Sequence, residues 1–341
     1  MIGIVFHRAG LDVFRLALSP SDPEIITSFR LNQVGLSDFE DGIRAAIGND
    51  DFELAGALIE TAQSQGYQIS EELIEAANPG LLAIAERNAL DAIEGAFTGE
   101  FSNSAGLIGA VTSDLSGVGD VRDVIIQGSA ALQDEEYDPV ILGLAAAGIA
   151  LTVGTIFTAS AAAPADTGVS VLKNAYRADR MSGPLRTHLR RVGGDVVDLT
   201  ELRRVMDDIS VRNIDRSRAQ LATIIRRDEL LEVERLASSM RRIGDNSGLR
   251  TSFEVMRYAE NGEDLTKFRR LSGTYGAQLL AVTVLLGKGA ITLGSLSFLI
   301  GSWIIFALVW ITSTSISIGM VCRKAWKWNK RRRLIKLSSD V

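Results

Sequence analysis

Two long uncharged runs limit what this chain can fold into. Residues 139–165, PVILGLAAAGIALTVGTIFTASAAAPA, contain no charged side chain, and crossing a bilayer takes ~20 apolar residues. Residues 271–322 contain a single charge, Lys288, and are long enough for two helices with a tight turn between them. The sequence therefore predicts an all-α integral membrane protein with about three transmembrane helices and two helical polar domains.

The first predicted span covers 139–165, and the second run predicts a hairpin with spans near 272–290 and 297–321. The first span is rich in Ala and Gly, and such small residues let helix backbones approach closely. A buried helix inside a helical bundle is the alternative for this segment. Lys288 falls near the hairpin turn, where we expect it to reach the membrane interface rather than to carry an ion.

The net charge of the chain changes sign at the first run. Residues 1–138 hold 24 Asp and Glu against 6 Arg, a net charge of −18, whereas residues 139–341 hold 18 against 30 Lys and Arg, a net charge of +12. The positive-inside rule then predicts a multi-pass protein of the bacterial inner membrane, with a periplasmic N-terminal domain and a cytoplasmic C-terminus. Because the first 19 residues make a poor signal peptide, a rival topology keeps the N-terminal domain inside and makes 104–165 a membrane-associated helical hairpin.

These patterns divide the chain into six segments: an acidic helical domain (1–100), an amphipathic helix pair with a Gly-rich turn (101–138), span 1 (139–165), a basic-acidic helical domain (166–270), a transmembrane hairpin (271–322) and a basic cytoplasmic tail (323–341).

In the tail, Trp326, Lys327, Trp328 and Arg331 form a predicted membrane anchor, since aromatic and basic side chains gather at the interface. Basic residues with interleaved aromatics also bind nucleic acids, but directly after a span the membrane interpretation is favoured.

Helix-start patterns mark the polar domains. Ser37-x-x-Glu40 and Asp198-x-x-Glu201 are predicted capping boxes, and Ser70 precedes a further predicted helix. Between them, residues 52–62 place apolar side chains on one helical stripe that ends before Gly66. We expect an antiparallel helical hairpin in the acidic domain.

The residues that usually perform catalysis or bind metals are sparse. There is one cysteine, Cys322, and the two histidines, His7 and His188, lie far apart, which makes a zinc site improbable. The acidic cluster 134–138 lacks the spacing of a calcium-binding loop. We therefore expect no catalytic residue, no metal and no cofactor.

A charged Gly-rich stretch, SDLSGVGDVRDVIIQG at 113–128, precedes the first span. As a transmembrane segment it would bury several charges at ~2.5–3.5 kcal/mol each, which argues against simple spanning. It instead predicts a turn between two amphipathic helices, built by Gly117, Gly119, Asp120, Arg122 and Asp123. Asp120 is expected to cap the second helix, with Asp123 in its first turn.

The segments TGEFSNSAGLIGAVTSDLSGVGDVRDVIIQG, DPVILGLAAAGIALTVGT, AAAPADTGVSVLKNAYRADRMS and GKGAITLGSLSFLIGSWIIFAL resemble an uncharacterised family of proteobacterial transmembrane proteins. The GVGDVRD turn is also similar to the pre-toxin regions of polymorphic secreted toxins. The family resemblance implies a bacterial membrane protein and, since the family has no established activity, no catalytic residue.

The predicted function is that of a non-enzymatic scaffold or interaction protein of a bacterial envelope. Its expected partners are the lipid bilayer and other proteins, with possible self-association through the helical domains and no nucleic acid. The alternative is a membrane-active or transport component, pore-forming or toxin-related. A pore is disfavoured because the hydroxyl side chains of the third span cluster at one end, and a helical enzyme is disfavoured because no nucleophile–base pair is apparent.

Overall fold

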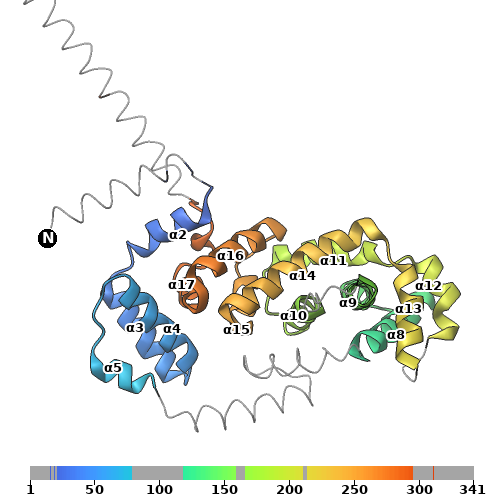
Figure 1. Cartoon of the computed structure of the whole chain (residues 1–341), viewed down its shortest axis with the longest axis horizontal. Helices are drawn as coiled ribbons and strands as arrows, with labels where there is room; N and C mark the ends of the chain where they lie inside the picture. Colours follow the sequence, from blue (N-terminus) through green and yellow to red (C-terminus); the bar gives the residue numbers. More distant parts are fainter. Residues whose placement is uncertain are drawn as a thin grey trace, which may run out of the picture. The chain divides into compact units, whose positions relative to one another are not determined.

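The computed structural model describes residues 16, 19, 21–78, 118–158, 166–209, 213–294 and 310 (Figure 1). The chain divides into two compact units, one of residues 21–292 and one that combines residues 1–20 with 293–341. All the elements described below belong to residues 21–292.

Within this described part, every regular element is a helix. The elements are α2 (Pro23–Leu31), α3 (Leu36–Gly48), α4 (Phe52–Ser64), α5 (Glu71–Ala76), α8 (Val118–Leu132), α9 (Pro139–Thr158), α10 (Asp166–Arg177), α11 (Gly183–Val196), α12 (Leu199–Val205), η1 (Met206–Asp208), α13 (Ile214–Leu221), η3 (Ala222–Ile224), α14 (Arg227–Ser247), α15 (Leu249–Met256), α16 (Gly262–Tyr275), η4 (Gly276–Gln278), α17 (Leu279–Leu286) and η5 (Gly287–Ala290). Val197 and Ile225 add one isolated antiparallel bridge. The all-α part of the prediction is therefore confirmed.

Side-chain caps fix several helix starts. The carboxylate of Asp198 accepts hydrogen bonds from the backbone N–H groups of Thr200 (2.9 Å) and Glu201 (3.3 Å), so the predicted start of α12 is confirmed. Asp51 caps α4 in the same way by accepting from Leu54 N–H at 3.1 Å. Such caps satisfy N–H groups that have no partner inside the helix.

Two other predicted starts differ in detail. Helix α3 begins at Leu36, one residue before the predicted cap, and the side chain of Asp38 accepts from the N–H of Gly35 at 2.9 Å. The capping box predicted from Ser37 is therefore wrong. Ser70 does lie at the N-cap of α5, but its hydroxyl makes no capping hydrogen bond.

Helix α9 lies in the centre of a helical bundle, where it packs against α8, α10, α11, α13 and α14 (Figure 1). Nearly every side chain described in this helix is buried by those neighbours. The buried apolar residues of α9 are Val140, Ile141, Leu142, Leu144, Ala145, Ala146, Ala147, Ile149 and Leu151. Burial of this kind is the main favourable contribution to folding, at roughly 25 cal/mol per Å² of apolar surface.

The small residues of α9 allow backbone contact between helices. A Cβ atom placed on Gly143 would lie 2.1 Å from the carbonyl oxygen of Gly193 in α11. A similar close approach joins α10 to α14, because a Cβ on Gly168 would lie 1.9 Å from the carbonyl oxygen of Ala237. The Ala- and Gly-rich composition of this region therefore serves helix packing inside the bundle.

This arrangement overturns the membrane prediction. No helix among the described residues combines the length and the apolar character that a bilayer crossing requires. The predicted fold class of an integral membrane protein is therefore wrong, and so is the predicted location as a multi-pass protein of the inner membrane. Residues 139–158 of the segment predicted as span 1 form the central helix α9, whose described side chains are mostly buried, which is the alternative that the sequence left open.

The predicted second span is broken by two glycines. Gly276 (φ +54°) and Gly287 (φ +53°) adopt backbone conformations that L side chains rarely reach, and the α-helix between them, α17, has only eight residues. An eight-residue helix is ~12 Å long, less than half of a hydrocarbon core. Lys288 forms an ion pair with Glu260 instead of reaching a membrane interface.

The remaining membrane elements cannot be compared in the same way. The third predicted span, near 297–321, lies outside the described residues apart from Trp310, which is helical and exposed. The predicted anchor of Trp326, Lys327, Trp328 and Arg331 lies wholly outside them.

The acidic N-terminal helices contact the basic later part of the chain directly. Helix α4 packs on α17, and α2 packs on α16 and α17. Arg250 of α15 forms a two-bonded ion pair with Asp51 across 199 positions of sequence. The predicted placement of these two regions on opposite faces of a membrane is therefore wrong, because they share an interface.

Candidate functional site

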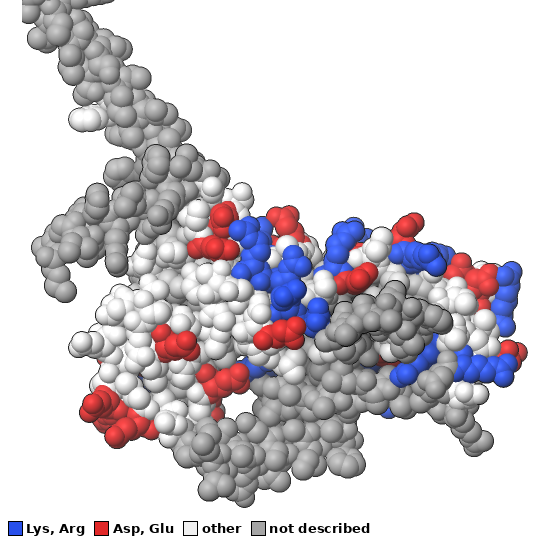
Figure 2. All heavy atoms as spheres, viewed as in Figure 1, with Lys and Arg blue, Asp and Glu red and all other residues white. Residues whose placement is uncertain are grey.

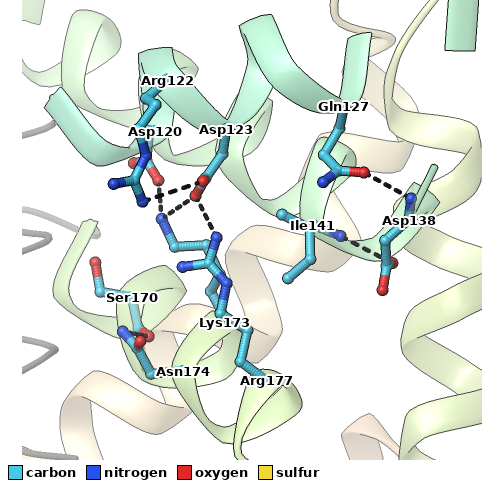
Figure 3. A network of polar contacts seen from close by, with 10 residues as sticks. All are labelled: Asp120, Arg122, Asp123, Gln127, Asp138, Ile141, Ser170, Lys173, Asn174 and Arg177. Atoms are coloured by element: carbon cyan, nitrogen blue, oxygen red, sulfur yellow. Dashed lines mark hydrogen bonds and ion pairs between the residues drawn. The ribbon is translucent and has the colours of Figure 1, made fainter. Parts of the chain in front are cut away.

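A network of charged side chains joins α8 to α10 inside the bundle (Figure 3). Lys173 Nζ of α10 lies 2.5 Å from Asp120 Oδ1 and 3.1 Å from Asp123 Oδ2, both carried by α8. Arg177 Nη2, one turn after Lys173, lies 2.7 Å from Asp123 Oδ2. The spacings i, i+3 on α8 and i, i+4 on α10 put each pair on one helix face, so that the two faces meet.

The network is buried at its centre and open at one edge. The side chain of Lys173 is 0% exposed, and those of Asp120 and Asp123 are 2% and 5% exposed. Arg177 is 29% exposed, and Arg122, whose Nη2 lies 3.5 Å from Asp123 Oδ1, is 59% exposed. The two buried carboxylates are thus matched by Lys173 and Arg177, and Arg122 adds a further positive charge towards solvent.

Two polar residues of α10 lie beside the network. The Asn174 side-chain amide donates to the backbone carbonyl of Ser170 at 2.9 Å, one turn earlier. The hydroxyl of Ser170 is buried without a hydrogen-bond partner. Lys173 and its sequence neighbours Val171 and Leu172 are all fully buried.

The connection from α8 to α9 has its own polar contacts (Figure 3). The carboxylate of Asp138 caps α9 by accepting from the N–H groups of Val140 (2.9 Å) and Ile141 (3.3 Å), and the N–H of Asp138 donates to the Gln127 side chain at 2.7 Å. Burial raises the pKa of the nearby Tyr176 phenol, with Arg190 acting in the opposite direction. Asp138, the last residue of the acidic cluster 134–138, is therefore a helix cap.

The sequence-predicted turn residues lie mostly in this network. Gly119, Asp120, Arg122 and Asp123 are all helical and belong to the first turns of α8, whereas Gly117 lies outside the described residues. Asp123, predicted in the first turn, is the sixth residue of α8 and so lies in its second turn. Asp120 lies within the first turn of α8 rather than before it, and its carboxylate contacts Lys173.

The partners of these residues were not singled out from the sequence. Lys173 and Arg177 lie 50 or more positions later, in the segment that the sequence assigns to the basic-acidic helical domain (166–270). The available indication was the pattern VSVLKNAYR, where a lysine falls within an apolar stripe of a predicted helix. A lysine at such a position is rarely buried unless it is paired.

The network is suited to holding helices together. Within the described residues no group of His, Cys, Asp and Glu side chains is arranged to hold a metal ion. The space between the two carboxylates is filled by the Lys173 ammonium group, which thereby takes the position that a bound cation would otherwise have. Since this ammonium group is fully buried, it has no contact with solvent through which a substrate could reach it.

His188 is separate from the network. Its Nε2 lies 3.5 Å from Glu232 Oε1, and its Nδ1 lies 3.0 Å from Arg191 Nη2. These contacts join α11 to α14 and include no serine, cysteine or threonine that could act as a nucleophile.

No family model matches this chain, and no curated protein or solved structure is similar to it. The resemblance of its segments to a proteobacterial transmembrane family accordingly stays a prediction.

Proposed function

We propose that this protein is a non-catalytic helical scaffold or interaction protein. The observation that carries the proposal is the burial of its ionic network, in which Lys173 is fully buried and its ammonium group is paired with Asp120 and Asp123. A buried ion pair of this kind adds little net stability, but its loss is costly, and in some proteins such pairs fix which helices pack together. The most distinctive polar chemistry of the chain is thus used to define the packing of the bundle.

The surface supports a protein partner, or a second copy of the chain, over a nucleic acid. Basic and acidic side chains alternate on the face drawn in Figure 2. On α14, for example, Arg235 pairs with Glu232 at 2.9 Å and Arg241 with Asp245 at 3.7 Å. Interspersed charges of both signs give a weak overall field, whereas a nucleic-acid surface needs an excess of unpaired basic groups.

A single large apolar side chain offers a place to test this proposal. Leu231 of α14 is 52% exposed, in the midst of these mixed charges. Ile126 of α8, 54% exposed, gives a matched control on a different helix. Because both side chains are mostly in solvent, their replacement by Asn should leave the fold intact.

The experiment uses the purified full-length chain at physiological salt. We measure its mass by light scattering over a range of concentrations and identify stoichiometric, chemically cross-linked protein partners by mass spectrometry. The proposal expects a self-associated species or a defined partner, which is lost in Leu231→Asn and retained in the Ile126→Asn control. A chain that stays monomeric and retains no partner in stoichiometric amount would refute the proposal.

A further inference from the structure

The N-terminal helices α3, α4 and α5 have a hydrophobic core of their own, separate from that of the bundle. The buried members of this smaller core from the three helices and their connections are Phe39, Ile43, Ala46, Ala55, Ala57, Leu58, Ile59, Ala62, Ile69 and Ala77. We call residues 36–77 the acidic module. Among the described residues, its core is completed by two further buried side chains, Leu280 and Ala281 of α17.

Helix α17 therefore lies between two cores. Leu279 and Val282 point into the core of the bundle, whereas Leu280 and Ala281 are buried against the acidic module. All four residues are at most 2% exposed. If the acidic module moved away, one apolar face of α17 would meet solvent while the other stayed packed.

Polar contacts at the edge of this interface pair N-terminal acidic groups with later side chains. Arg250 contacts Asp51 through two bonds and lies 3.6 Å from Glu53, and Gln278 Nε2 donates to Glu60 Oε1 at 3.1 Å. Residues 21–78 hold 12 Asp and Glu against 2 Arg, and red side chains predominate over this region in Figure 2. The charge split of the sequence is thus used, at least in part, to hold two regions of one chain together.

The connections of the acidic module allow it to move as a unit. Helix α2 is fixed to the later part of the chain, because Thr27 Oγ1 donates to Ala290 O at 2.7 Å and Arg30 Nη2 donates to Thr292 O at 3.0 Å. Only residues 32–35 separate α2 from α3. Hinges are typically a few loop residues at the end of a fixed element, so residues 32–35 are the candidate hinge of the acidic module.

We propose that the acidic module is a detachable cover of α17, and that the Arg250–Asp51 contact is its latch. The latch is partly open to solvent, since the side chains of Arg250 and Asp51 are 18% and 20% exposed. Salt weakens ion pairs that solvent can reach, and elements with few core contacts open at a smaller free energy than the whole fold. Opening of the cover exposes the face of α17 that carries Leu280 and Ala281.

The test measures opening with a single cysteine as reporter. In the full-length chain with Cys322→Ser, Ala281→Cys reports on the cover, and Ala147→Cys in α9 reports on the core of the bundle. Both alanines are 0% exposed, so that a thiol-reactive probe reaches either one only after opening. The proposal expects Ala281→Cys to be labelled faster than Ala147→Cys, and added salt to accelerate only the first.

A substitution at the latch supplies the second measurement. Asp51→Asn removes the charge but retains a good N-cap for α4. We expect it to accelerate labelling of Ala281→Cys about tenfold, the change given by one charge-assisted hydrogen bond, and to leave Ala147→Cys unchanged. The control is Asp41→Asn, because Asp41 is an exposed residue of α3 that pairs with Arg44 on the same helix.

Two results would overturn the proposal. If both reporters are labelled at one common rate at every salt concentration, the chain opens only by global unfolding and the module is not detachable. If Asp51→Asn accelerates labelling no more than Asp41→Asn, the Arg250–Asp51 contact is not the latch.

Discussion

Replacement of Lys173 by Met tests the role assigned to the buried network. Met retains most of the side-chain volume and removes the charge, so the change isolates the ion pairs from packing. Asp123 keeps its contact with Arg177 at 2.7 Å, whereas Asp120 loses the ammonium group at 2.5 Å while its side chain is only 2% exposed. Removing one partner of a buried pair costs ~3–5 kcal/mol, and the lower half of this range applies because one carboxylate stays paired.

The measurement is the free energy of unfolding from denaturant titration, supported by the thermal midpoint. A loss of ~3–4 kcal/mol lowers Tm by roughly 4–6 °C in a chain of 341 residues. The double variant Asp120→Asn/Lys173→Met should be more stable than Lys173→Met alone, because it also removes the buried carboxylate charge that the Lys173 ammonium group neutralises. Lys267→Met is the control, since the side chain of that lysine is 22% exposed and its nearer partner, Glu263, is mostly exposed.

If Lys173→Met unfolds at the same denaturant concentration as the Lys267→Met control, the buried ion pairs of Lys173 do not stabilise the bundle. If the effects of Asp120→Asn and Lys173→Met simply add, the two side chains do not interact, and the role assigned to the network is wrong.

Three further predictions follow from the packing, the backbone and the ionisation of the chain. Gly143→Ala should lower the free energy of unfolding by at least ~1–3 kcal/mol, since its Cβ would overlap the backbone of Gly193, whereas Gly56→Ala, with open space around the new Cβ in α4, should raise it by ~0.5–1 kcal/mol; denaturant titration of both variants checks this. Asp134→Gly should stabilise the chain by ~1 kcal/mol in the same assay, because Asp134, in the turn that follows the end of α8 at Leu132, has φ +57°; an unchanged or lower stability would contradict this expectation. Burial, with a smaller contribution from Glu24, raises the pKa of Tyr275 to about 12 from 10.0, so its neutral form stabilises the fold below pH 10 and this contribution is lost as the pH rises towards 12; unfolding curves across this window should fall more steeply for the wild-type chain than for Tyr275→Phe, and parallel curves would contradict it.

Helix positions were largely predictable from the sequence because they depend on local patterns. The cap at Asp198 and the stripe of 52–62 are both found in the structure. The character of α9 was not predictable in this way. An uncharged run of Ala, Gly, Leu and Ile is equally stable against lipid and against other helices, and the helices that bury α9 lie up to 100 positions further along the chain.

The candidate site was found in part. Asp120 and Asp123 are candidate site residues because charged residues next to an apolar run are unusual. Their sequence neighbours, however, predict a helix cap and a turn. The interaction that defines them is with Lys173, 53 positions after Asp120, and nothing local specifies it. The charge split was misinterpreted for the same reason. Asp51 and Arg250 are 199 positions apart, so their contact could not be predicted from the sequence, and the separation of charges was interpreted as a membrane topology.

That separation of 199 positions also has a consequence in time. A ribosome adds ~5–20 residues per second, so Asp51 is synthesised roughly 10–40 s before Arg250. During this interval the acidic module has no α17 against which to complete its core. The strong negative charge of residues 21–78 then keeps nascent chains apart by mutual repulsion until the basic partner emerges.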